Sequence, residues 1–144
     1  MMCVELPADK SARQYSILIA GRNPQLREAV AANFPAQAYS VAFAADGREA
    51  FDKAKAQHFD LVITGILMGK LDGIELLDAL RKLDANRPVI VVADSDSEIE
   101  NVYLRCAALM GAARTFQHPL DPLTFHRNAR AVILQSRLPQ QQKD

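Results

Sequence analysis

The chain has 144 residues, of which 49% are hydrophobic, and 17 basic residues balance 17 acidic ones. This length suits one globular domain with a substantial buried core, and the balanced charge argues against a surface that binds nucleic acid through net charge. Two cysteines, Cys3 and Cys106, are too few for a disulfide framework or a zinc site.

Five segments have the composition of β-strands. Residues 17–19, 61–63 and 89–92 are short apolar runs rich in β-branched side chains, which is typical of central parallel strands covered on both faces. Residues 39–43 alternate larger with smaller side chains and predict an edge strand. Residues 115–116 are expected to form a fifth short strand at the other edge.

Helix-start signals follow the first three strands. Asn23 precedes a proline, and Asp46 and Asp72 are each followed three residues later by a glutamate, which is the spacing of a capping box. We therefore expect helices to alternate with strands along the chain.

A fourth helix is expected to begin near Ser95 or Ser97 and to end before Gly111. The side chains expected on its buried face are Ile99, Val102, Tyr103, Cys106 and Met110. Cys106 is thus interpreted as a core residue and not as a reactive thiol.

A last helix is expected after Pro122, with Arg127, Arg130 and Arg137 in solvent. Its apolar stripe consists of Phe125, Ala129, Val132 and Ile133. Together the elements predict an α/β domain of (βα)5 type over residues 15–137, a doubly wound five-stranded parallel sheet whose crevice lies at the carboxyl ends of the strands. Residues 1–14 are expected to be an N-terminal tail, and the glutamine-rich residues 138–144 a C-terminal tail or the start of a linker.

Neither a signal peptide nor a membrane span is expected. Residues 1–9 lack a basic region followed by an apolar run, and no apolar stretch approaches the roughly 18 residues of a membrane helix. With reduced thiols, these features predict a cytoplasmic protein without membrane contact.

Three segments resemble the signatures of response regulator receiver domains. They are Ala-Asp-Gly-Arg-Glu-Ala at 45–50, Met-Gly-Lys-Leu-Asp-Gly-Ile-Glu-Leu-Leu at 68–77, and Gly-Ala at 111–112. The resemblance extends over roughly residues 15–137. It implies the flavodoxin-like receiver fold with strand order 2-1-3-4-5 and a role in bacterial two-component (phosphorelay) signalling.

The positions that carry the family's chemistry differ in this chain. The acidic pair that holds magnesium after the first strand aligns with Gly21 and Arg22, and the phosphoacceptor aspartate after the third strand aligns with Gly65. A glycine has no group to phosphorylate, and a guanidinium reverses the charge where a divalent cation would bind.

The remaining chemical positions differ as well. The hydroxyl residue that contacts the phosphoryl group aligns with Ala93, and the lysine before the proline after the fifth strand aligns with His118. The aromatic switch residue of the fifth strand aligns with Thr115. We therefore expect a degenerate receiver, or pseudo-receiver, with no catalytic residue, no metal and no cofactor.

Two interpretations of the altered pocket remain open. In the first, Arg22 and His118 meet over Gly21 and Gly65 near the start of the first helix and bind a small anion. In the second, Arg22 fills the vacated volume and pairs with Asp94 or another nearby carboxylate. Thr64 is expected to point to the opposite side of its strand from position 65.

The family's usual output surface consists of the fourth helix, the fifth strand and the fifth helix. Here the helices carry opposite charges, which allow a two-fold homodimer with reciprocal contacts, while a solvated face explains the same charges. Leu104 and Ala108 are expected to expose a small apolar patch. The candidate contact residues are Asp96, Glu100, Leu104, Ala108, Arg127 and Arg130.

Two main hypotheses follow. The first is a phosphorylation-independent module that docks onto a signalling protein of unknown identity, and is not an enzyme. The second is a sensor whose pocket binds a small anion or metabolite. A phosphorylatable regulator that uses a substitute acceptor, such as Asp94 or Asp72, is the least favoured.

Overall fold

The computed structural model describes residues 14–95 and 97–136, over which strands and helices alternate. The strands are β1 (Tyr15–Ala20), β2 (Tyr39–Ala44), β3 (Leu61–Thr64), β4 (Val89–Ala93) and β5 (Arg114–Gln117). The helices are α2 (Pro24–Ala31), α3 (Gly47–Ala56), α4 (Gly73–Leu83), α5 (Glu98–Leu109) and α6 (Pro122–Ser136). The two predicted tails, apart from Gln14, lie outside the described residues, as do Asp96 and Arg137.

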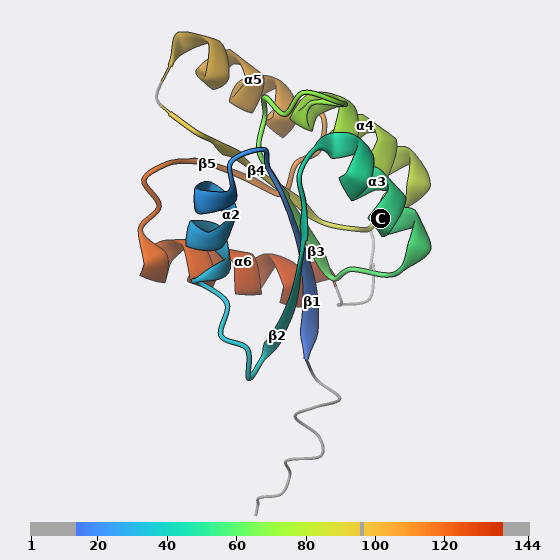
Figure 1. Ribbon diagram of the computed structural model, residues 1–144, viewed down its shortest axis with the longest axis vertical. Helices are drawn as coiled ribbons and strands as arrows, with labels where there is room; N and C mark the ends of the chain where they lie inside the picture. Colours follow the sequence, from blue (N-terminus) through green and yellow to red (C-terminus); the bar gives the residue numbers. More distant parts are fainter. Residues whose placement is uncertain (1–13, 96, 137–144) are drawn as a thin grey trace, which may run out of the picture.

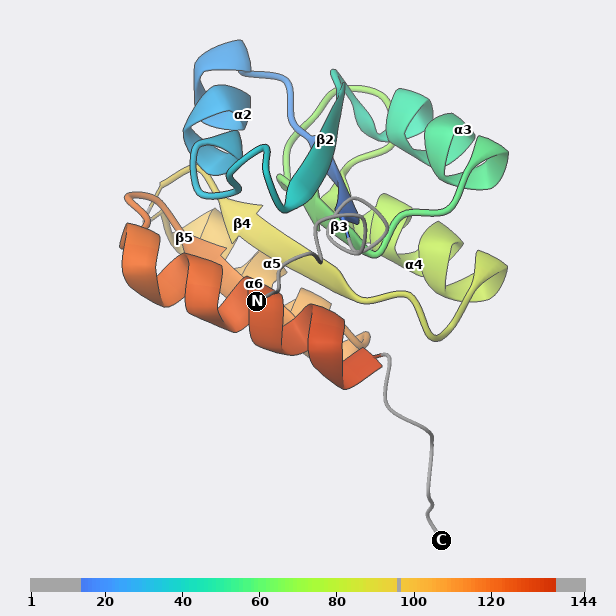
Figure 2. The same ribbon diagram turned by 90° about the horizontal axis from the view of Figure 1, so that it is seen from below.

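The strands form a single parallel sheet in the order β2-β1-β3-β4-β5, which confirms the predicted doubly wound fold. Helices α3, α4 and α5 cover one face of this sheet, and α2 and α6 cover the other (Figures 1 and 2). Along β1, Leu18 packs into the first layer, whereas Ile17 and Ile19 pack into the second. Both faces of the central strands are therefore apolar, because both are covered.

The strand register places the ends of four strands at one edge. Ala20 pairs with Thr64 across β1 and β3, and Ala93 pairs with Gln117 across β4 and β5. In a parallel sheet the segments that follow these residues emerge side by side. This edge is where the predicted site residues meet.

The helix starts follow the predicted capping signals. Asp72 and Glu75 form a complete capping box, with bonds of 2.9 and 3.0 Å between side chain and main chain. At α3 only half of the box forms, since Glu49 accepts from the main-chain N–H of Ala45 and not from that of Asp46. Ser97, and not Ser95, caps α5.

The predicted buried face of α5 is wrong in part. Tyr103 and Met110 pack against the core as expected, but the inner side of the helix also includes Glu100, Leu104 and Ala107. Ile99, Val102 and Cys106, which were expected in the core, are exposed. The small side chain of Ala107, fully buried, lets α5 approach the sheet closely, so packing overrides the simple apolar pattern.

None of the helices within residues 14–95 and 97–136 combines the length and the apolar character needed to span a bilayer.

Candidate functional site

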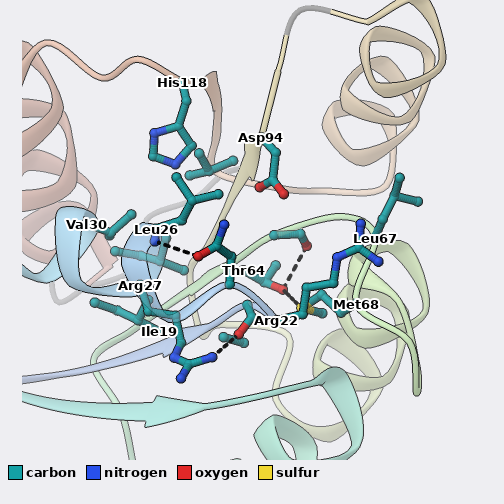
Figure 3. A pocket seen from close by; sticks show the side chains of 16 residues that line it. Ile19, Arg22, Leu26, Arg27, Val30, Thr64, Leu67, Met68, Asp94 and His118 are labelled. Atoms are coloured by element: carbon teal, nitrogen blue, oxygen red, sulfur yellow. Dashed lines mark hydrogen bonds between the residues drawn. The ribbon is translucent and has the colours of Figure 1, made fainter.

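A small pocket lies at the carboxyl edge of the sheet, between the segments that follow β1, β3, β4 and β5 (Figure 3). Its volume is about 30 Å³. Four of the five predicted pocket residues line it, together with Asp94: Gly21, Arg22, Gly65 and His118. Ala93 does not line the pocket, because its methyl group is buried in the core layer beneath, while its carbonyl accepts from the His118 N–H at 2.9 Å.

The two glycines of the pocket are not required by packing. A Cβ built on Gly65 would have its nearest neighbours at 3.9 Å, and one built on Gly21 would lie 3.6 Å from Arg27. Gly73, by contrast, would place a Cβ 2.1 Å from the carbonyl oxygen of Gly65. The space at positions 21 and 65 therefore admits a side chain that this sequence does not supply.

Two arginines, Arg22 and Arg27, line the pocket, and Arg27 is the one that a hydrogen bond holds in place. Its half-buried guanidinium donates to the main-chain carbonyl of Gly21 at 2.5 Å. Arg22 is exposed and forms no hydrogen bond or ion pair with a described residue, so the expected pairing of Arg22 with Asp94 is wrong. The role of Arg27 left no signal in the sequence, since it depends on how α2 lies against β1.

Met68 and Thr64 fill the floor of the pocket. Met68 is buried, with its sulfur 3.5 Å from the hydroxyl oxygen of Thr64. That hydroxyl donates to the carbonyl of Gly65 at 2.9 Å. Thr64 lines the pocket. The prediction that its side chain points to the opposite side of the strand from position 65 stays a prediction, because Gly65 has no side chain with which to compare it.

Asp94 is the one carboxylate among the residues that line the described pocket. Burial, and next the nearby carboxylate of Glu100, raise the pKa of Asp94, while His118 and Arg22 act in the opposite direction. Over residues 14–95 and 97–136, no three His, Cys, Asp or Glu side chains come together in a group that would hold a metal ion.

The residues expected on the partner surface do not share one face. Glu100 is buried, and its carboxylate accepts from the Ser95 N–H at 3.1 Å. Arg130 reaches the hydroxyl of Tyr39 at 3.4 Å, at the start of β2 and away from α5. The other candidates are placed as follows: Arg127 and Ala108 are exposed, Leu104 is half-buried against the core, and Asp96 lies outside the described residues.

Two further residues, Thr115 and His126, pack against neighbouring elements. Thr115, which aligns with the family's aromatic switch residue, is half-buried on β5 opposite Val91. His126 is half-buried, with its Nε2 3.0 Å from the hydroxyl of Tyr39 and its ring edge to face with that of Phe34. Tyr39 and His126 are 87 residues apart in the chain, which is why no local pattern indicated this contact.

Comparisons with known proteins agree on one family. The family model described as "Response regulator receiver domain" matches residues 17–129. The alkaline phosphatase synthesis transcriptional regulatory protein PhoP of Bacillus subtilis is 28% identical over 106 residues, which cover 74% of this chain and 43% of that protein. The probable transcriptional regulator ycf29 of Porphyra purpurea is 38% identical over 110 residues, covering 75% of this chain and 51% of that protein.

Solved structures show the same fold. The receiver domain of the Francisella response regulator 1452 superimposes with a TM-score of 0.74 at 22% identity, covering 86% of this chain and 100% of that chain. The receiver domain of a signal transduction histidine kinase from Syntrophus aciditrophicus gives a TM-score of 0.75 at 20% identity, covering 90% and 97%. The present chain spans about half, or less, of the length of the two curated relatives.

Proposed function

We propose that this chain, which belongs to the response regulator receiver domain family, is a degenerate receiver that acts by docking onto a signalling partner without being phosphorylated. Receiver domains are signalling domains and not enzymes, and several relatives of this chain are transcriptional regulators. The proposal concerns how this particular receiver works.

The observation that carries the proposal is the glycine at the end of β3. In receiver domains a carboxylate at this place attacks the phosphoryl donor, and Gly65 has no side chain. The neighbouring pocket holds the guanidinium of Arg27 against Gly21 and adds the charge of Arg22. A divalent cation here would meet two positive charges, which repel it.

The filled floor of the pocket supports a single resting state. Met68 is buried beside Thr64, and the Thr64 hydroxyl donates a hydrogen bond to the carbonyl of Gly65. Close-packed side chains resist rearrangement. We therefore expect the docking surface to be presented constantly, with no dependence on a phosphoryl donor.

The sensor hypothesis has less support than docking. The pocket of about 30 Å³ has room for water, whereas small-molecule pockets typically measure about 300–1,000 Å³. The first N–H groups of α2 that an anion would use are already bonded, since the Asn23 side chain accepts from Gln25 and Leu26.

A homodimer through the α5, β5 and α6 face remains part of the proposal, but its basis changes. Two of the charged residues expected to pair between copies are not available for it. Glu100 is buried, and Arg130 donates a hydrogen bond to the hydroxyl of Tyr39. Exposed side chains of α5 are the better contact candidates.

The test is intact mass spectrometry after incubation with magnesium and acetyl phosphate, with a phosphorylatable receiver as the positive control. We expect no phosphoryl adduct and no magnesium-dependent rise in Tm. A stoichiometric, hydroxylamine-labile adduct on this chain would overturn the proposal, since it would show that a nearby carboxylate, such as Asp94, serves as acceptor. The Asp94→Asn variant would then identify the residue.

A further inference from the structure

Two adjoining hollows lie at the edge of the sheet opposite to the pocket of Gly21 and Gly65. Their volumes are about 190 and 440 Å³, and the larger falls in the range of small-molecule sites, about 300–1,000 Å³. The segments that follow α3 and α4, two helices that lie side by side in Figures 1 and 2, border them. Because His58, Asp84 and Arg87 border both hollows, each presents the same three polar side chains.

Arg87 is a buried arginine whose hydrogen-bonding capacity is only partly used. Its side chain is 7% exposed. Nη1 donates to the main-chain carbonyl of Ala54 at 3.3 Å, whereas Nε has no hydrogen-bond partner among the described residues. A buried donor without an acceptor is unfavourable. Since a planar guanidinium holds a carboxylate through two parallel N–H groups, Arg87 still offers such a pair in Nε and Nη2.

Asp84 approaches this guanidinium but does not bond to it. Its Oδ2 lies 3.9 Å from Nη2 of Arg87, beyond the roughly 3.2 Å limit of a hydrogen bond. Its Oδ1 accepts from the main-chain N–H of Asn86 at 3.0 Å, which holds the carboxylate in position. A donor and an acceptor are thus held apart, and a molecule that both accepts and donates fits between them.

A second carboxylate, that of the buried Asp60, borders the smaller hollow. It accepts from the main-chain N–H of Ser16 at 2.8 Å and lies 3.4 Å from Nε2 of His58. The smaller hollow therefore combines one guanidinium with two carboxylates beside an imidazole. The carboxylates repel a simple anion, and Arg87 repels a simple cation. The site suits a ligand that carries both charges.

We propose that these hollows bind a free amino acid with a neutral aliphatic side chain. Its carboxylate accepts from the unfilled donors of the Arg87 guanidinium, and its ammonium donates to Asp84, with Asp60 adding negative charge. Hydrogen bonds between charged groups are roughly twice as strong as those between neutral ones. The carboxyl ends of α3 and α4, which meet here, carry partial negative charge and also favour the ammonium.

The larger hollow indicates the kind of side chain. Leu83 is 43% exposed there, and Ala54 and Ala56 border it as well. Lys55 also borders it, but its ammonium lies over the ring of Phe51, 5.1 Å from the ring centroid. An aliphatic group of the ligand would cover Leu83 and remove apolar surface from water.

The first experiment measures the binding of L-leucine to the full chain by isothermal titration calorimetry. We expect saturable binding with a Kd on the order of 1 mM. Two analogues each lack one charge, since isocaproate has no ammonium and isoamylamine has no carboxylate. Each should bind at least about tenfold more weakly, because it leaves one charge of the site without its partner.

Two variants test the named residues. Asp84→Asn keeps an oxygen that accepts from Asn86 but removes the negative charge, and Arg87→Lys keeps the positive charge but removes the paired donors. Each should weaken L-leucine binding by about tenfold or more. Asp78→Asn, on the exposed side of α4 and outside both hollows, is the matched control and should leave binding unchanged.

Circular dichroism establishes that each variant is folded. Asp84 is 37% exposed, so its replacement keeps the test valid even if the buried Arg87 does not tolerate change. Amide chemical shifts of the labelled chain then locate the ligand. L-Leucine should shift the amides of residues 57–60 and 84–87, and not those of Gly21 and Gly65.

The outcomes decide between an amino acid and water at this site. Absence of saturable binding, or binding of either analogue as tight as that of L-leucine, overturns the proposal and leaves water to bridge Arg87 and Asp84. Binding that Asp84→Asn leaves unchanged, or shifts confined to Gly21 and Gly65, overturns the location. None of these results depends on whether the chain accepts a phosphoryl group, so the proposed function is tested separately.

Discussion

Arg27 donates a hydrogen bond from its guanidinium to the main-chain carbonyl of Gly21, and thereby joins α2 to the end of β1. The bond crosses the edge of the sheet at which receiver domains bind magnesium. A positive charge is thus held by the fold at this edge, while the exposed Arg22 beside it has no comparable bond.

This difference between the two arginines predicts unequal effects on stability. Arg27→Ala should lower the free energy of unfolding by about 1.5–3 kcal/mol, because it removes a charged hydrogen bond and the packing of a half-buried side chain. Arg22→Ala should change it by no more than about 0.5 kcal/mol. Urea unfolding followed by circular dichroism measures both, and equal losses would contradict the assignment of Arg27.

The glycines at the strand end and at the helix start should respond in opposite ways to alanine. Gly65→Ala should stabilise the chain by about 0.4–1 kcal/mol, because the site has space for a Cβ and the unfolded chain loses freedom. Gly73→Ala should destabilise it by about 1–3 kcal/mol or more, since its Cβ would meet the Gly65 carbonyl oxygen. The measurement is the Tm of each variant relative to that of the unchanged chain. A lowered Tm for Gly65→Ala would contradict the space described at this position.

The carboxyl group of Asp94 should make stability depend on pH. Burial and Glu100 raise the pKa of Asp94 in the folded chain, so the unfolded chain releases this proton at a lower pH than the folded chain does. Stability is therefore lost as pH rises through the unfolded value of about 3.9 toward the folded one.

Asp94→Asn should accordingly raise the free energy of unfolding at pH 7 by up to roughly 0.5 kcal/mol, a small value because the group is partly solvated. The gain should disappear below about pH 3, where the acid is protonated in both the folded and the unfolded chain. Denaturant unfolding at the two pH values checks this. A gain that is equal at both would assign the effect to packing instead of charge.

The hydroxyl of Tyr39 should contribute to stability through its contacts with α6. It lies 3.0 Å from Nε2 of His126 and accepts from Arg130 at 3.4 Å, a bond that also raises the pKa of Arg130. Tyr39→Phe should cost about 1 kcal/mol, because it leaves a half-buried imidazole without its partner. Tyr103→Phe, whose hydroxyl has no hydrogen bond to a described residue, is the control and should have no measurable effect on Tm.

The positions of the strands and the order of elements were determined by the sequence alone. A central parallel strand is apolar on both faces because both are covered, so residues 17–19, 61–63 and 89–92 are recognisable without any knowledge of their neighbours. Capping residues such as Asp72 act on the main chain within three residues, and they too are local. The family resemblance added the strand order, which the structure confirms.

The site and the exposed surfaces were decided only by tertiary structure. Which side of α5 faces the sheet depends on how closely Ala107 approaches it, and this rotation moved Ile99 and Val102 from the predicted core to the surface. The partners of Arg27 and His126 lie on other elements, so their roles depend on distances that no local pattern records. Local residue preferences select helices and strands, whereas the packing of one element on another selects which side chains remain free to bind a partner.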